Sequence, residues 1–147
     1  MKDRSPAIGE KALRAILLLI AAWHVVTGAM ALVAPDTFFD QIGHYGIENS
    51  HYVGDVGAFM LAFGVAVGIA VVRPSWRAPV LWLGALWYGF HAINHAFDTG
   101  EAKSEARGWS DTLLIAFGAV ASAWLARVSE RLNAATAGGR RPSGGSG

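Results

Sequence analysis

Four long apolar segments follow one another along the chain, separated by polar stretches. They cover about residues 13–33, 53–72, 78–97 and 110–127. The hydrocarbon core of a bilayer is about 30 Å thick, a distance that about 20 helical residues cross. Because a backbone amide in lipid must find its partner within its own segment, each apolar segment is predicted to be an α-helix. The pattern therefore predicts an all-α protein, a four-helix transmembrane bundle with up-down topology.

The two ends of the chain do not change this prediction. Basic residues precede the first apolar segment, as in a signal peptide, but that segment is too long for one and three more follow it. We therefore expect the first segment to be a retained membrane span. Residues 138–147 are mainly Gly, Ser, Arg and Pro and are predicted to be a disordered tail. The predicted membrane domain accordingly covers residues 1–137.

The distribution of charge predicts an orientation in the membrane. If the four segments alternate in direction, ten of the twelve Lys and Arg residues lie on one side: Lys2, Arg4, Lys11, Arg14, Arg73, Arg77, Arg127, Arg131, Arg140 and Arg141. Only Lys103 and Arg107 lie on the other side, where most of the acidic residues gather. Basic residues accumulate on the cytoplasmic side of membrane proteins, so both termini are predicted to be cytoplasmic.

The connections between the segments carry helix signals of their own. In the first outer loop, residues 36–43 are predicted to form a short interfacial helix with Asp36 as its N-cap and Gly43 just beyond its end. Ser110 is expected to be the N-cap of the fourth helix. The tight turn at residues 73–77 predicts that the second and third helices are antiparallel neighbours. A GxxxG motif, Gly64 to Gly68, predicts the packing face of the second helix.

The candidates for a functional site are polar residues that interrupt the apolar pattern. His91, Asn94, His95 and Asp98 are spaced to share one face of the third helix. His51 and Asp55 begin the second helix at the same outer level. His24 lies in the middle of the first helix, at a depth similar to that of His91, about 18 Å above the inner interface at 1.5 Å per residue.

Three chemical interpretations fit these residues. A metal site would use His51, Asp55, His91, His95 and Asp98, whose mixed N and O donors suit Zn, Cu or Fe. A proton-linked or quinone-linked site would bind a small redox or lipid-like ligand, with His24 and Asn94 as further contacts. A haem between His24 and His91 is the third, and nothing else in the sequence favours it. The chain has no cysteine, which excludes thiolate ligands and thiol nucleophiles.

A plainer interpretation of the same residues needs no ligand. A histidine within the membrane can simply bond to a neighbouring helix, as we expect for His24. The acidic residues near the helix ends can be ordinary caps in contact with water. On this interpretation the chain is an accessory or structural subunit whose polar residues stabilise the bundle or an interface with a partner. A transporter is disfavoured, because the four spans show no inverted repeat.

Two segments of the chain resemble a known family. The first carries Asn-x-His-x3-Asp-x-Gly-Ala and the second carries His-x3-His-x2-Asp, in residues Asn49, His51, Asp55, His91, His95 and Asp98. In these, and loosely across residues 21–126, the chain resembles small four-helix membrane proteins of actinobacteria that are relatives of the broad DoxX-like group. The resemblance implies the fold and a place in the bacterial cytoplasmic membrane, but no reaction. The expected partners are the lipid bilayer and a membrane protein or a second copy, not nucleic acid.

Overall fold

The computed structural model describes residues 8–138, and this part of the chain is helical with no strand. The elements in order are α1 (Glu10–Val33), α2 (Pro35–Phe38), the π-helical turn η1 (Phe39–Gly43), α3 (Ser50–Val72), α4 (Pro74–Phe97), the 3-10 turn η2 (Thr99–Glu101) and α5 (Glu105–Gly138). The all-α prediction is therefore confirmed for these residues. The predicted disordered tail lies outside the described residues, except for Gly138, which ends α5.

Three of the helices are long and apolar enough to cross a membrane: α1, α3 and α5. The fourth long helix, α4, is not among them, although its 24 residues match α1 in length. The physical reason is its composition, because His91, Asn94 and His95 lie among its apolar residues and lower its mean hydropathy. The chain is thus a helical protein with three helices that qualify as membrane spans.

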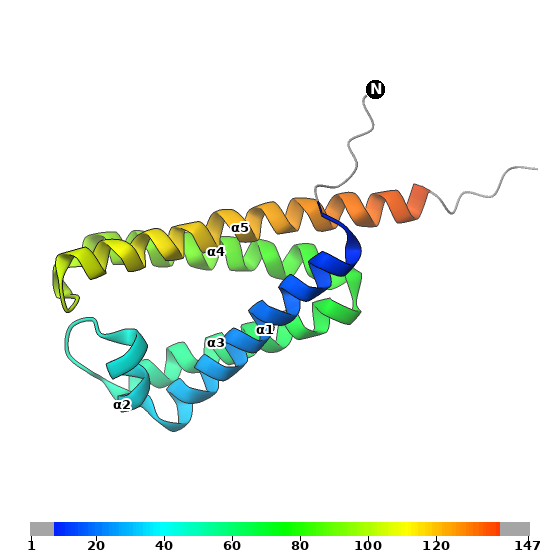
Figure 1. The fold of residues 1–147 in the computed structure, drawn as a ribbon. Helices are drawn as coiled ribbons and strands as arrows, with labels where there is room; N and C mark the ends of the chain where they lie inside the picture. Colours follow the sequence, from blue (N-terminus) through cyan, green and yellow to red (C-terminus); the bar gives the residue numbers. More distant parts are fainter. Residues whose placement is uncertain (1–7, 139–147) are drawn as a thin grey trace, which may run out of the picture.

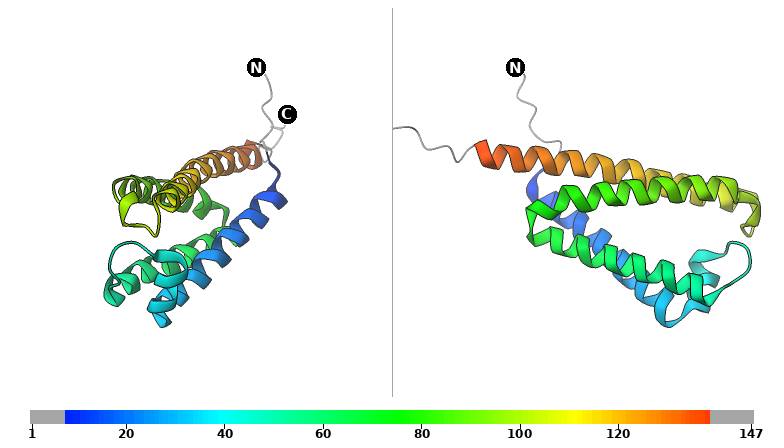
Figure 2. Two further views of the ribbon diagram at one scale, coloured as in Figure 1. Left: turned by 60° about the vertical axis from the view of Figure 1, so that its left-hand side comes forward. Right: turned by 180° about the vertical axis from the view of Figure 1, so that it is seen from behind.

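The long helices form two antiparallel hairpins (Figure 1). In one hairpin α1 packs along α3, and in the other α4 packs along α5, while α1 and α5 scarcely touch. The hairpins converge at one end, which holds Arg14, Arg73 and Arg77 and is called the basic end. They diverge toward the opposite end, which holds the α2 and η2 connections and is called the acidic end; Figure 2 shows this divergence from two further sides.

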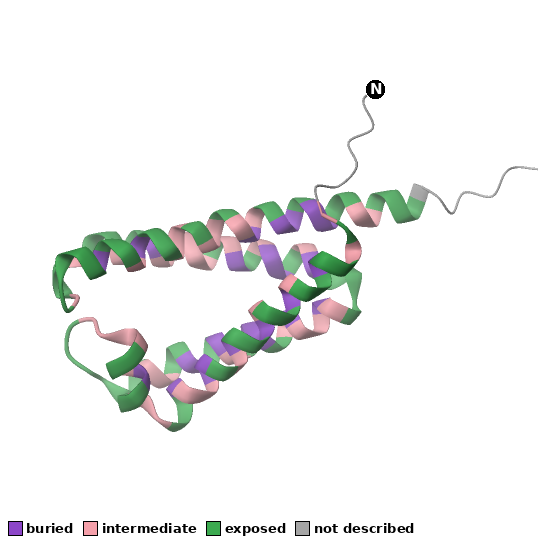
Figure 3. Ribbon diagram, viewed as in Figure 1, coloured by how far each residue is buried: buried purple, intermediate pink, exposed green. Residues whose placement is uncertain are grey.

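The buried core lies where the hairpins converge. Leu17 of α1, Val67 of α3, Leu81 of α4 and Leu125 of α5 belong to one cluster of buried side chains. Toward the acidic end the buried residues lie mainly within each hairpin, as the purple segments show (Figure 3). The apolar contact that holds the hairpins together is therefore concentrated at the basic end.

Glycines allow α1 and α3 to touch backbone to backbone. A methyl group added to Gly28 would lie 2.5 Å from the amide nitrogen of Leu61, and one added to Gly57 would lie 2.7 Å from Cβ of Ala31. At Gly64 the nearest atom, the amide nitrogen of Val25, would be at 2.8 Å. The GxxxG motif thus predicted the packing face correctly at Gly64. The close contact continues toward the acidic end, because Gly28 and Gly57 face each other there.

A buried arginine joins three helices at the basic end. The side chain of Arg77 is 1% exposed, and its guanidinium donates to both carboxylate oxygens of Glu10 at 2.8 Å. Its Nε also donates to the carbonyl of Ala70 at 3.0 Å, and Nη2 donates to that of Val71 at 3.3 Å. These two carbonyls belong to the last turn of α3, where no intrahelical donor remains for them. Arg77 therefore ties the start of α1 to the α3–α4 turn.

The three helix caps predicted from the sequence are all wrong. The interfacial helix is present as α2 and η1, but Asp36 is not its N-cap: the helix begins at Pro35, whose missing N–H suits the first helical position. Gly43 is the last residue of η1 rather than the residue after it. Ser110 lies inside α5, which begins at Glu105 because the hydroxyl of Ser104 accepts a hydrogen bond from the Arg107 amide at 3.2 Å.

Candidate functional site

A cavity of about 930 Å³ lies between the two hairpins, on the side of the acidic end. Its wall is mainly apolar and aromatic, with polar side chains from the loops and from α4 and α5. All four long helices contribute to it, and so does the segment that follows α2. Ligand pockets commonly occupy about 300–1,000 Å³ and combine an apolar wall with a few placed polar groups. The cavity has the size and the composition of such a pocket.

His24 lies in the wall of the cavity and is fully hydrogen-bonded. Its Nδ1 lies 2.7 Å from the carbonyl of Ile20, and its Nε2 lies 2.5 Å from the hydroxyl of Tyr88. Because a carbonyl can only accept, Nδ1 carries the proton and Nε2 accepts from the tyrosine. This pair agrees with the plainer interpretation of His24 as a bond between helices. It also leaves neither ring nitrogen free for a haem iron.

His91 and His95 share one face of α4, and both line the cavity. Their ring centroids are 4.5 Å apart, and Trp87 stacks on His91 one turn earlier with centroids 6.0 Å apart. The ring of Tyr45, from the loop before α3, meets His95 edge-on at 4.3 Å. The Nδ1 atom of His95 is buried and has no hydrogen-bond partner among the described residues. A ligand in the cavity would reach this nitrogen only after the imidazole ring turned toward it.

The other predicted site residues lie apart from this pair. Asn94 lines the edge of the cavity and donates to Asp98 at 3.0 Å on the exposed side of α4. His51 and Asp55 form an exposed pair on α3, with Nε2 and Oδ2 3.6 Å apart, and neither lines the cavity. Within residues 8–138, no three His, Asp or Glu side chains are grouped so that they could hold a metal ion. Metal binding by the five predicted residues therefore stays a prediction, and their placement does not favour it.

A strap, defined as residues 39–49, crosses the end of the cavity that faces the loops. Three hydrogen bonds attach it to the α4–α5 connection and to the first turn of α5: Tyr45 donates to the Gly108 carbonyl at 3.4 Å, Gly46 donates to the Glu101 carbonyl at 3.3 Å, and Lys103 donates to the Asp40 carbonyl at 3.1 Å. Burial raises the pKa of the Tyr45 hydroxyl, and the negative charge of Asp111 raises it further. Tyr45 is consequently a neutral donor at the mouth of the cavity.

Tyr88 precedes His91 by three residues and so shares its face, and this spacing indicates a residue that borders a pocket or packs between helices. Other residues of the site escaped the sequence reasoning. Tyr45 carries no such signal, because it reaches the cavity only through the path of the strap. Arg107 and Asp111 line the mouth as an ion pair at 3.0 Å, and their i,i+4 spacing predicts the pair but not its place.

Comparison of the chain with protein-family models, with curated proteins and with solved structures finds no match. The resemblance to DoxX-like proteins therefore rests on the residues quoted above and stays a prediction.

Proposed function

We propose that the protein is a multi-pass protein of the bacterial cytoplasmic membrane, with all four long helices crossing the bilayer as an up-down bundle. The antiparallel hairpins and the near-equal lengths of α1, α3 and α4 support this arrangement. The basic end carries the arginines that favour the cytoplasmic side, which would place both termini there and the acidic end outside. The DoxX-like relationship belongs to the same proposal and concerns the fold only.

The polar residues of α4 are compatible with a membrane span. His91 and His95 are only partly exposed and line the cavity, and the more apolar Leu83, Leu86 and Phe90 lie on exposed parts of the helix. Ionisable residues within membrane spans commonly face the bundle interior or a cavity. The low hydropathy of α4 is thus what a span that lines a binding site would show.

The proposed function is the binding of a small redox-active or lipid-like molecule in the cavity. One observation carries this proposal: a mainly apolar space of about 930 Å³ has two neighbouring imidazoles in its wall, one with an unpaired nitrogen. A metal ion is the weaker alternative, because in the described part of the chain no third His, Asp or Glu is grouped with His91 and His95 in a way that could hold an ion. An organic molecule needs no such third ligand.

The test is to identify what the purified protein carries. The protein is extracted in mild detergent, its organic extract is analysed by mass spectrometry, and its metal content is measured by elemental analysis. We expect one organic molecule per chain at most, lost from the His91→Ala/His95→Ala variant while the variant keeps its size-exclusion profile. His51→Ala/Asp55→Ala, which alters the exposed pair outside the cavity, is the matched control and should keep the molecule.

The rival proposal is an accessory or structural subunit. It expects a protein that carries no organic molecule and no metal, and whose His91→Ala/His95→Ala variant loses only thermal stability. That result would refute the binding function. The polar residues would then serve as contacts within the bundle or with a partner.

A further inference from the structure

The polarity of the cavity changes along its length. Toward the middle of the helices its wall is mainly apolar, with Met60 of α3 and Ile115 and Phe117 of α5. The polar atoms of His24 at this level are already bonded to Tyr88 and to the Ile20 carbonyl. Toward the acidic end the wall carries Tyr45 and His95. An amphiphile lying along the helices would therefore place its polar group near the strap and its apolar chain near the middle of the bundle.

The polar end of the cavity offers hydrogen bonds but no free fixed charge. Arg107 and Asp111 are the only Lys, Arg, Asp or Glu among its lining residues, and they neutralise each other at 3.0 Å. Charged groups without a partner are costly to bury, so a charged ligand would find no compensation here. The Tyr45 oxygen, whose proton is donated to the Gly108 carbonyl, can accept a hydrogen bond, and the imidazole of His95 can donate or accept, so together they match a hydroxyl or carbonyl group. The polar group of the ligand is therefore expected to be neutral.

The strap crosses the mouth of the cavity toward the loops, and the cavity is also open toward the side. The strap, with its three hydrogen bonds to the α4–α5 connection, covers the end that would face water. On the flank between α1 and α5, Trp23 is 57% exposed and Phe117 is 68% exposed, and both also line the cavity. Trp23 precedes the end of α1 by ten residues, or about 15 Å along the helix, which is the depth of acyl chains.

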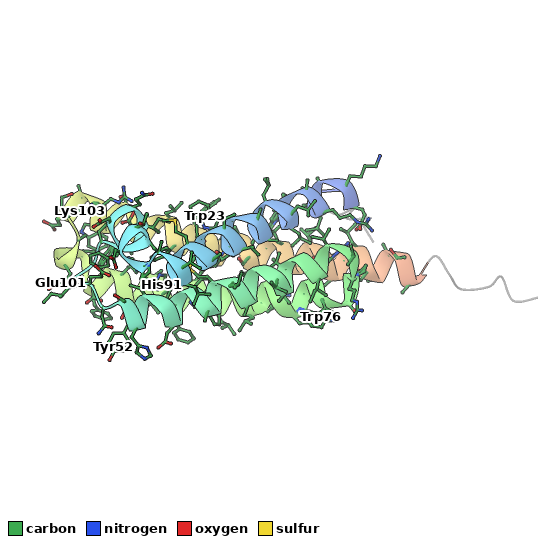
Figure 4. The ribbon with its side chains drawn as sticks, turned by 90° about the horizontal axis from the view of Figure 1, so that it is seen from below. Trp23, Tyr52, Trp76, His91, Glu101 and Lys103 are labelled. Carbon is green, nitrogen blue, oxygen red and sulfur yellow. The ribbon has the colours of Figure 1, made fainter. Side chains whose placement is uncertain are left out.

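The opposite flank differs in depth and in polarity. There the exposed lining residues include Tyr52, in the first turn of α3, and Asn94, near the end of α4. Trp23 and Tyr52 mark opposite edges of the molecule (Figure 4). Val56, which is 44% exposed and lies six residues into α3, is the deepest exposed lining residue of this flank on α3, so the flank at Tyr52 opens nearer the acidic end than the flank at Trp23.

We propose that the cavity takes its ligand from the membrane, through the gap between α1 and α5, and that this ligand is a single-chain amphiphile with a neutral hydroxyl or carbonyl group. The inference rests on the proposed function and adds the class of the ligand and its source. The chain enters beside Trp23 and Phe117 at mid-membrane depth. The polar group rises toward His95 and toward Tyr45 of the strap.

The test uses Trp87, which lines the cavity, as a fluorescent reporter. The five other tryptophans are replaced by phenylalanine, and the protein is reconstituted into phosphatidylcholine vesicles. Stearyl alcohol brominated at mid-chain is then added as a quencher that reaches Trp87 from the membrane. Iodide is the quencher that reaches it from water. Brominated stearate has the same chain with an anionic group and reports on the preference for a neutral one.

Gly118→Leu is the blocking variant. Gly118 lines the cavity on α5, where an added Cβ would lie 3.4 Å from the ring of Tyr88, so a leucine there fills the space beside the reporter. Gly89→Leu is the matched control, because an added Cβ at Gly89 has no atom within 4 Å and Gly89 does not line the cavity. Gly118→Leu should weaken the apparent affinity for the brominated alcohol roughly tenfold, and Gly89→Leu should leave it unchanged.

Three results would overturn the inference. Quenching by iodide and not by the alcohol would mean that the cavity fills from water, and a water-borne ligand would still satisfy the proposed function. Equal quenching in both glycine variants would place the alcohol outside the cavity. Stronger quenching by brominated stearate would contradict the neutral group.

A second measurement covers the case in which the single-tryptophan variant does not fold. The natural chain has no cysteine, so a single Cys can be introduced at Met60, in the cavity wall, or at exposed Ser50. A water-soluble, membrane-impermeant thiosulfonate should modify Ser50→Cys readily and Met60→Cys hardly at all. Equal modification of both would contradict access from the membrane.

Discussion

Replacing Arg77 perturbs the joint that ties the start of α1 to the α3–α4 turn at the basic end. Arg77→Met removes the guanidinium but keeps a long side chain in the buried space. Glu10 loses one partner and retains Arg14, whose Nε lies 2.7 Å from its carboxylate. The carbonyls of Ala70 and Val71 lose a donor at a helix end that has no other. The damage is therefore expected at the end of α3 and less at Glu10.

The expected magnitude follows from how far each group is buried. A buried polar group left without a partner costs about 1–3 kcal/mol, so two carbonyls cost about 2–6 kcal/mol. Because these two lie at the edge of the core, the lower part of that range, about 2–4 kcal/mol, is expected for Arg77→Met. Glu10→Gln leaves Arg77 bonded to both carbonyls, and the glutamate side chain is 43% exposed. Partial exposure screens that pair, so about 1 kcal/mol is expected. Arg77→Lys should lie between the two, because an ammonium cannot present the planar fork of donors.

The assay is reversible unfolding in mixed detergent micelles, with the free energy of unfolding measured for the wild type, Arg77→Met, Glu10→Gln and the double variant. The double variant should resemble Arg77→Met, since Glu10 contributes mainly through the arginine. Two results would refute the view that the main role of this arginine is to cap α3. One is a Glu10→Gln variant that loses as much stability as Arg77→Met. The other is an Arg77→Met protein that is as stable as the wild type.

Two further predictions concern the α1–α3 contact and the strap. Gly28→Ala should destabilise the protein by about 1–3 kcal/mol, because its methyl group meets the backbone of α3, and Gly54→Ala, with open space around it, should not; unfolding in micelles distinguishes them. The pKa of Glu48 is raised by the hydrogen bond that it shares with the carboxyl of Asp36. The folded state therefore binds this proton more tightly, which favours folding at low pH and is lost as pH rises through the raised pKa. Glu48→Gln should gain stability relative to the wild type as pH rises from acidic to neutral, and equal pH profiles would contradict this.

The helices were predictable from the sequence because lipid permits few alternatives to them. Long apolar runs require helix, and Arg73-Pro74 stops α3 and starts α4 without a longer loop. The length of α5 was not predictable from hydropathy, since it continues past Arg127 on residues that are polar but good helix formers. Its start was predicted too late, because Ser104 and Ser110 both have side chains that can cap a helix. The path of the preceding turn determines which of the two is the N-cap.

The site was predictable in part. Helical spacing placed His91 and His95 on one face, because i,i+4 geometry is fixed within a single helix. Spacing could not show that His51 and Asp55 point away from them, because the rotation of α3 is set by its glycine contact with α1. Tyr45 was unpredictable for a different reason. It contacts His95 because of the path that the strap follows, and a loop has no regular repeat from which the position of its side chains could be predicted.

The most direct test of the cavity as a binding site is its occupancy, counted by native mass spectrometry of protein released from mild detergent. Wild type and Gly89→Leu should each carry the same retained organic molecule, and Gly118→Leu should carry much less of it. A Gly118→Leu protein that retains the molecule as fully as the wild type would show that the space between the two hairpins is not where it binds.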